Sequence, residues 1–252
     1  MKLRRITLLW CGVFLILLSM FSAATPVAPD TVFRGQSERF NVGGGASGQP
    51  SEAGNLTPIF VSGQRVTARW QGYFGNVSGG ITLADAAGNS MYDWGLANPS
   101  GEIYAANHSS VAWSQIFCVN FSANLAEETL NRDTLNRFLG YVTDAEKASD
   151  DSINKTFNQT FGTDGSTLIV GSRTFTQTDN CSMTTLNDAT GYQTSRFKEV
   201  LLTDNTSIVF TSILENDQNS FSTAPADFEM IVGVNGTVSG VTRTYFFFVE
   251  LS

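Results

Sequence analysis

Short segments of alternating apolar and polar residues run through most of the chain, and this pattern limits the fold more than any other feature. The clearest example places Gly80–Asp85 before Met91–Trp94, with Ala87, Gly88 and Asn89 as turn residues between them. A period of two is typical of half-buried strands, and a short Gly/Asn turn between two such segments predicts a β-hairpin. Strands that recur every roughly 8–12 residues predict an antiparallel β-sandwich or barrel-like sheet.

The same pattern predicts further strands on both sides of this hairpin. We expect them at Thr57–Val61, Arg65–Phe74, Glu102–Ala106, Val111–Val119, Thr167–Gln177, Phe197–Thr203, Ser207–Leu214, Phe228–Val234 and Val241–Leu251. The last segment is apolar on both faces from Tyr245 to Val249, which favours a central strand. Trp70 and Trp94 fall in the apolar phase of their strands, which favours core positions over an exposed sugar-binding platform.

Between residues 123 and 160 the period changes to that of a helix. Leu125, Leu130, Leu135 and Phe138 recur at roughly helical spacing, and a second short helix is expected around residues 150–157. The sequence therefore predicts a mainly β fold, one or more antiparallel β-sandwiches with a small helical insertion around 123–160. A first β region at 55–122 and a second at 161–252 are expected to pack as one unit.

Residues 1–24 have the layout of a secretory signal peptide. A basic start precedes the uncharged run Ile6–Phe21, and Ser22-Ala23-Ala24 forms a small-residue cleavage site. A retained membrane anchor is the alternative. As a helix the uncharged run would rise about 24 Å, which is short of the roughly 30 Å hydrocarbon core. We therefore expect export with cleavage after Ala24, and a secreted, extracellular or cell-surface protein.

A short arm at residues 25–40 and a Gly/Ser/Ala-rich linker at 41–54 follow the predicted cleavage site. The linker composition is typical of a flexible tether, which would let the arm reach a neighbouring subunit. The arm is then a candidate for strand donation, in which a segment pairs with the sheet edge of another chain. Pairing within its own domain, or disorder, are the alternatives.

Cysteine usage agrees with export. Cys11 lies inside the predicted signal peptide, so the mature chain retains Cys118 and Cys181. An even pair in an oxidising compartment predicts one disulfide, although two buried free thiols are the alternative.

Nine Asn-x-Ser/Thr sequons without proline at x are the strongest sign of an exported glycoprotein. They begin at Asn55, Asn76, Asn107, Asn120, Asn154, Asn158, Asn180, Asn205 and Asn235. An Asn-rich chain produces some sequons by chance, but most of these lie at expected turns or strand ends. We expect several to carry N-linked glycan.

Charge and motif content exclude several functional classes. The net charge is −8, which offers no electrostatic footprint for nucleic acid. His108 is the single histidine, so a Ser/His/Asp triad would depend on it without a nucleophile elbow. The adjacent acids Glu127-Glu128 and Asp150-Asp151 are better explained as solvated helix faces than as catalytic pairs. We therefore expect no catalytic residues, no metal site and no cofactor, although calcium at Asp204-Asn205 or Glu215–Asp217 remains open.

Several segments give the chain a resemblance to a known class of proteins. The block Trp70–Gly79 (Trp-Gln-Gly-Tyr-Phe-Gly-Asn-Val-Ser-Gly), together with Ala53–Thr57, Gly101–Ala105 and Thr244–Leu251, resembles uncharacterised exported archaeal cell-surface proteins. The resemblance implies a cell-surface setting and no mechanism. The leading hypothesis is a non-enzymatic, glycosylated structural protein of a surface coat or extracellular filament, which associates with itself or with other cell-surface proteins. The alternative is a carbohydrate- or surface-binding adhesion module.

Overall fold

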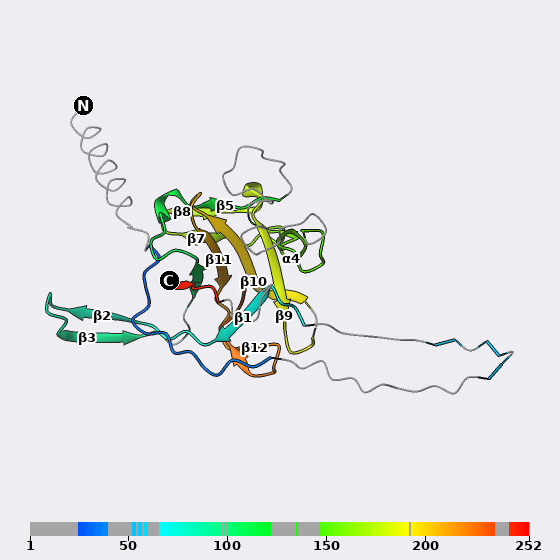
Figure 1. Ribbon diagram of the computed structural model, residues 1–252. Helices are drawn as coiled ribbons and strands as arrows, with labels where there is room; N and C mark the ends of the chain where they lie inside the picture. The colour runs from blue at the N-terminus through cyan, green and yellow to red at the C-terminus, as the bar shows by residue number, and fades with distance from the viewer. Residues whose placement is uncertain are drawn as a thin grey trace, which may run out of the picture.

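The computed structural model of the protein is mainly β (Figure 1). It describes residues 25–39, 52–53, 55–56, 58–59, 66–96, 98, 100–121, 135, 147–191, 193–234 and 242–251. Four predictions lie wholly or largely outside these residues: the signal peptide at 1–24, the linker at 41–54, the strand Thr57–Val61 and most of the helical insertion. Within the described residues, no helix has the length and apolar character needed to span a membrane.

A seven-stranded antiparallel sheet forms the centre of the molecule. Its strand order is β15-β4-β11-β10-β9-β6, and β5 also pairs with β10. The bounds are β4 Gly101–Ala106, β5 Phe117–Cys118, β6 Gln159–Thr160, β9 Ser182–Asn187, β10 Gln193–Thr203, β11 Ile208–Ile213 and β15 Phe246–Leu251. The chain neighbours β9, β10 and β11 are also neighbours in the sheet, whereas β4 and β15 join them from the two ends of the sequence.

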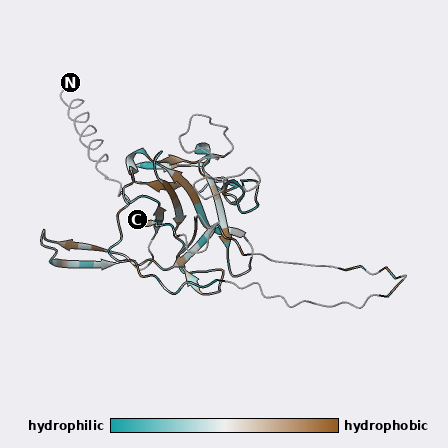
Figure 2. Cartoon of the chain, viewed as in Figure 1, coloured by the Kyte–Doolittle hydropathy of each residue, from teal (hydrophilic) through white to brown (hydrophobic). Residues whose placement is uncertain are grey.

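Both faces of the central sheet are buried. Alternate residues of the same strand enter different cores, so that Tyr104 and Ala106 face one cluster and Ala105 faces the other. The end of β10 (Val200–Leu202) and the start of β11 (Ile208–Phe210) are therefore continuous apolar segments, and Figure 2 colours much of this region as hydrophobic. Burial on both faces explains why these strands do not show a simple alternation.

Two smaller layers cover the sheet. On one face the hairpin of β7 (Leu168–Val170) and β8 (Arg173–Phe175) contributes to the first core. On the other face β1 (Trp70–Gly75) pairs with β14 (Phe228–Gly233), and α4 (Ile153–Thr156) supplies Ile153 to the second core. Strands from both predicted β regions thus share the same sheets, and α4 lies inside the predicted helical insertion.

Two further hairpins complete the described part. β12 (Gln218–Asn219) pairs with β13 (Pro225–Ala226) beside the body, whereas β2 (Gly80–Ala84) and β3 (Ser90–Gly95) form a ribbon that projects away from it (Figure 1). The 3-10 helices η1 (Trp113–Gln115) and η2 (Gln177–Asp179) lie between strands. The predicted strand Val111–Val119 is therefore wrong in its first part, because η1 precedes β5.

The prediction that the last segment is a central strand is also wrong. β15 lies at the edge of the sheet, next to β4. Its two apolar faces have a different cause: Phe248 packs against Trp113 in the first core, whereas Phe247 packs against Tyr73 of β1. β15 is therefore apolar on both faces because a layer covers each face of the sheet, not because β15 has a neighbouring strand on each side.

The N-terminal arm contacts this edge within its own chain. Val27 and Val249 form an isolated antiparallel bridge through two backbone hydrogen bonds, with N···O distances of 2.9 and 2.8 Å. Beyond the bridge, residues 30–39 are exposed and the side chain of Phe33 is 92% accessible. The start of the arm thus lies on the free side of β15, through Val27 alone, whereas residues 31–39 form no strand.

The structure joins Cys118 and Cys181 in a disulfide. Their Cα atoms lie 4.7 Å apart, within the usual range for a disulfide, and both residues belong to the first core. Cys118 lies in β5 and Cys181 precedes β9, so the bond ties two segments that flank the helical insertion. The two residues that the sequence predicted to pair are therefore paired.

We predict that replacing both cysteines destabilises the fold. The sequence separation is 63 residues, and closing a loop of this length restricts the unfolded chain by roughly 3–4 kcal/mol in free energy. Urea unfolding of a Cys118→Ala/Cys181→Ala variant, followed by tryptophan fluorescence, should show this loss relative to the oxidised wild type. Native protein with two alkylatable thiols would contradict the prediction.

Candidate functional site

The predicted glycosylation residues fall into two groups by accessibility. Asn55, Asn76, Asn158, Asn180 and Asn205 are exposed, whereas Asn107, Asn120 and Asn154 are half-buried, and Asn235 lies outside the described residues. Asn107 has a structural contact as well, because its Oδ1 accepts the Ile208 N–H at 2.7 Å. Asn180 and Asn205 have φ values of 53° and 73°, a conformation that asparagine tolerates better than most residues.

Residues considered for catalysis or metal binding are held in structural roles. His108 is exposed in a bend after β4. Asp151 accepts the hydroxyl hydrogen bonds of Thr67 and Ser149, at 2.8 and 2.6 Å. Asp204 accepts the N–H groups of a surrounding loop, from Ala112 (2.8 Å), Thr206 (2.9 Å) and Ser207 (2.6 Å). Glu127-Glu128 lie outside the described residues.

The two tryptophans considered for sugar stacking, Trp70 and Trp94, and Trp113 of η1 have different environments. Trp70 packs against Phe157 and Phe210, and Trp113 packs against Tyr104 and Phe248. Trp94 instead lies on the projecting ribbon with 48% of its surface accessible. The prediction that Trp94 belongs to the core is therefore wrong. Alternation identified the apolar face of its strand correctly, but no described layer of the protein covers that face.

The ribbon β2–β3 has one apolar face. Ile81 pairs with Trp94 and Leu83 pairs with Tyr92, so these four side chains lie on the same side of the ribbon. Their accessible fractions are 58, 48, 52 and 59% respectively, and the rings of Tyr92 and Trp94 contact each other with centroids 4.8 Å apart. Every residue of both strands is exposed.

The opposite face of the ribbon is polar and internally bonded. Thr82 donates to Ser90 at 3.1 Å, and Ser90 donates to Asp93 at 2.8 Å. At the base of the ribbon, a Cβ on Gly79 would overlap the side chain of Leu251. Gly79 therefore lets the chain pass close to the end of β15 before it leaves the body as β2.

A pair of buried carboxyl groups lies at the edge of the central sheet. Glu102 on β4 is directly opposite Glu250 on β15, and both residues are buried. The Tyr104 hydroxyl donates to Glu250 Oε2 at 3.0 Å, and the Gly171 N–H donates to both oxygens of Glu250 at 3.1 and 3.0 Å. Because Gly171 follows β7, this carboxylate also fixes the β7–β8 layer on the sheet.

Burial and, to a smaller extent, the charge of Glu250 raise the pKa of Glu102 from 4.5 to about 8, against a hydrogen bond from the Ile169 backbone that lowers it. Burial also raises the pKa of Glu250, but Gly171 and Tyr104 stabilise its ionised form. At neutral pH we therefore assign the proton of the pair to Glu102 and the charge to Glu250. The edge of the core thus contains one neutral and one charged carboxyl group side by side.

Two more buried glutamates lie on the opposite side of the sheet, where Glu199 attaches β14 and Glu229 attaches the β12–β13 loop. Glu199 of β10 is fully buried and accepts the Ile231 N–H of β14 at 2.9 Å, while its other oxygen has no hydrogen-bond partner. Burial raises the pKa of Glu199 strongly. Glu229 of β14 accepts the Phe221 N–H at 2.8 Å, and its pKa is raised by burial and by the charge of Asp188.

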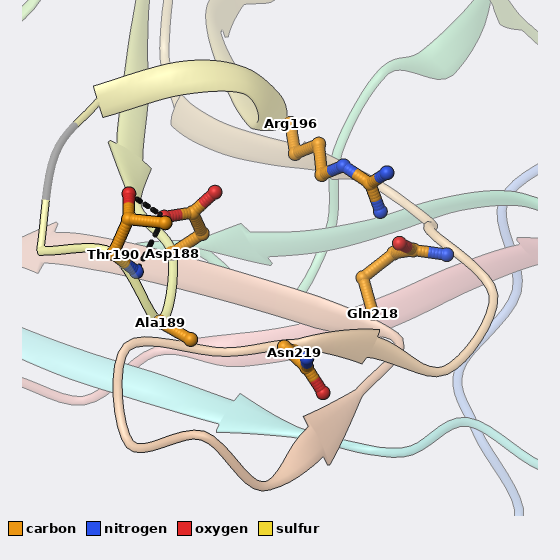
Figure 3. A pocket seen from close by; sticks show the side chains of 6 residues that line it. All are labelled: Asp188, Ala189, Thr190, Arg196, Gln218 and Asn219. Atoms are coloured by element: carbon orange, nitrogen blue, oxygen red, sulfur yellow. Dashed lines mark hydrogen bonds between the residues drawn. The ribbon is translucent and has the colours of Figure 1, made fainter.

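A small polar pocket of about 270 Å³ lies where the β9–β10 loop meets β12 (Figure 3). It is lined by Asp188, Ala189, Thr190, Arg196, Gln218 and Asn219. Figure 3 shows the side chains of Arg196 and Gln218 reaching toward each other from opposite walls, with Asp188 and Thr190 across from them. Asp188 Oδ1 accepts both the N–H and the hydroxyl of Thr190, at 2.8 and 2.5 Å.

The sequence did not single out the pocket, the carboxyl pair or the exposure of the ribbon. Each depends on strands that are distant in the sequence, such as Glu102 with Glu250 or Asp188 with Gln218. The one available signal was the lone acid within the apolar segment Tyr245–Leu251. A charged residue inside a strand that is apolar on both faces indicates a buried, partnered carboxyl group.

Comparison of the chain with models of known protein families, with curated proteins and with solved structures found no match in any of the three.

We predict that the free energy of unfolding falls as the pH rises through neutrality. Unfolded Glu102 loses its proton near pH 4.5, whereas the folded protein keeps it until about pH 8. The folded state binds more protons in this window, so the stabilisation is present at about pH 4 and is lost by about pH 9. Urea unfolding from pH 5 to 9 should show a decrease on the order of a few kcal/mol.

Glu102→Gln, a neutral isostere of the protonated acid, tests the origin of this effect. The variant should equal the wild type near pH 5 and exceed its stability near pH 9, with the remaining slope due to the other buried acids. The same change at Glu38, which is exposed in the arm, should leave the profile unaltered. A Glu102→Gln profile parallel to that of the wild type would contradict the assignment.

We also predict that the protein is exported and that its exposed sequons carry N-linked glycan. Asn76, Asn158, Asn180 and Asn205 are accessible, as attachment requires. Glycopeptide mass mapping should find these sites modified, and Asn→Gln at each should remove one glycan from the intact mass. Unmodified Asn76 and Asn205 in native material would count against a glycoprotein.

Proposed function

We propose that this chain is a non-enzymatic, glycosylated structural subunit of an extracellular assembly, either a surface coat or a filament. The observation that carries the proposal is the uncovered apolar face of the ribbon. A two-stranded hairpin is marginally stable alone in water. Contiguous exposed apolar surface on an exported chain marks an interaction site.

We propose a second copy of the same chain as the partner of this face. The face formed by Ile81, Leu83, Tyr92 and Trp94 carries no charge, whereas the chain as a whole has a net charge of −8. A cationic partner would be attracted to the acidic body rather than to this face. Two ribbons related by a two-fold axis would cover each other's apolar rows with matching chemistry, the usual symmetry of a homodimer contact.

A surface coat or filament needs a second contact, because a two-fold contact closes on itself. The arm can supply it. Val27 bridges to Val249 on the free side of β15 in its own chain, and the same two backbone bonds would form if a neighbour donated its arm. In strand donation, the bridge between Val27 and Val249 of one chain would be replaced by the same bridge between two chains. No additional surface would be needed.

The proposed setting rests on the sequence. The signal-peptide layout, the sequons and the resemblance to exported archaeal cell-surface proteins support export to a cell surface. We propose the disulfide and N-linked glycans as adaptations to that location. An adhesion module that binds carbohydrate is the alternative, and it would be a soluble monomer that does not assemble with other copies of itself.

The ribbon predicts self-association that depends on its apolar face. In the exported protein, Leu83→Ser together with Trp94→Ser should weaken association by about tenfold or more, because the buried contact loses two large apolar side chains. Sedimentation velocity and electron microscopy of native and variant protein measure the effect. Both residues are exposed, so circular dichroism should show an unchanged body.

Thr82→Ala on the polar face is the matched control and should associate as the wild type does. Deletion of residues 25–39 separates the two contacts: ribbon dimers should persist, while larger assemblies should disappear. A wild-type protein that stays monomeric at high concentration, or a double variant that still assembles, would refute the ribbon contact.

A further inference from the structure

We propose that the pocket between the β9–β10 loop and β12 binds one neutral sugar unit through a pair of its hydroxyl groups. The proposal goes beyond the structural role and does not depend on it. The volume of about 270 Å³ lies just below the roughly 300–1,000 Å³ that is typical of ligand pockets. It therefore suits a single ring rather than an extended chain.

The lining has the chemistry that hydroxyl groups require. A sugar hydroxyl both donates and accepts, and this wall offers a carboxylate acceptor at Asp188, guanidinium donors at Arg196, and an amide with both functions at Gln218. One negative and one positive side chain leave the lining formally neutral. Asp188 disfavours an anionic ligand and Arg196 disfavours a cationic one, which favours a ligand without net charge, such as a polyol.

The pocket is held by a rigid frame. Thr190 fixes Asp188, and Asp188 forms a β-bridge with Ser220, which ties the β9–β10 loop to the β12–β13 hairpin. Gln218 is restrained as well, because its Nε2 donates to the Asn216 carbonyl at 2.7 Å. Side chains whose positions are fixed before binding lose less entropy when a ligand arrives.

Arg196 lies where the pairing of β10 with β9 is irregular. The register between β10 and β9 shifts between Gln193 and Lys198, and the buried Phe197 has a φ of 47°. A left-handed conformation at a phenylalanine is strained. Interruptions of strand pairing such as β-bulges often redirect a side chain next to a functional site. Here the strained residue directly follows Arg196, which Figure 3 shows reaching over the pocket.

The sugar could come from two sources with the same hydroxyl chemistry. It could be part of an N-linked glycan on a neighbouring copy, since exposed sequons such as Asn158 and Asn180 are available. It could also be part of a separate surface polysaccharide. Comparing protein made with and without glycosylation distinguishes the two.

The test is a titration of the full exported chain with the methyl glycosides of glucose, galactose and mannose, followed by saturation-transfer NMR and calorimetry. We expect at least one to bind with roughly millimolar affinity, as few contacts to one ring allow. Arg196→Ala and Gln218→Ala should each weaken binding by about tenfold. Arg34→Ala, an exposed arginine in the arm, is the matched control and should bind as the wild type does.

Glucuronate, the anionic counterpart, should bind no better than the neutral glycoside. If the source is a neighbour's glycan, glycosylated protein should self-associate more strongly than its Arg196→Ala variant; if it is a polysaccharide, the two should associate equally. Absence of binding by all three glycosides at tens of millimolar, equal binding by Arg196→Ala, or tighter binding of glucuronate would overturn the proposal. None of these results would alter the ribbon contact.

Discussion

Burial of the central sheet on both faces is the constraint on which the rest of the structure depends. It requires a covering layer on each side, β7–β8 on one and β1–β14 on the other, and the chain attaches both with carboxyl groups. Glu250 accepts the Gly171 N–H of the first layer, and Glu199 accepts the Ile231 N–H of the second. Because backbone N–H groups are weaker counterparts than cations, these acids keep raised pKa values. The cohesion of the layers is thereby linked to pH.

The same constraint explains which elements extend from the body. Once both faces of the sheet are covered, the core has no place for the apolar rows of β2–β3, so the ribbon leaves beside the end of β15, where Gly79 lets it pass Leu251. The arm meets the same strand through Val27 and Val249. Both elements proposed for assembly therefore originate at one edge of the sheet, where exchange or docking disturbs neither core.

The sequence predicted the fold class and most strands because alternation, turn residues and apolar segments are local signals. The hairpin β2–β3 and strands β4, β11 and β14 lie where the pattern placed them, within a few residues. The sequence pattern could not predict where each strand lies in the order of the sheet. The doubly apolar Tyr245–Val249 is compatible with a central strand or with an edge strand between two layers, and it is the latter. The prediction that Trp94 belongs to the core was wrong for a related reason. Alternation identifies the apolar face of a strand, but it does not show whether another layer covers that face. The pocket was beyond reach, since Asp188, Arg196 and Gln218 meet only through tertiary packing.

An exposed apolar ribbon is a hazard as well as a contact, since a chain that displays it before assembly risks indiscriminate aggregation. The polar face limits that risk from one side, because Thr82, Ser90 and Asp93 form hydrogen bonds with one another there and the apolar row lies on the other face.

The proposed glycosylation would limit the risk of aggregation further, since the exposed Asn76 lies four residues before β2 and a glycan there is bulky and hydrated. A partner must then approach the apolar face from the side that the glycan leaves open. Another ribbon of the same shape meets this restriction when the two-fold axis keeps both glycans outside the contact. Steric exclusion by the glycan and attraction between the apolar rows would together favour one geometry of association over non-specific aggregation.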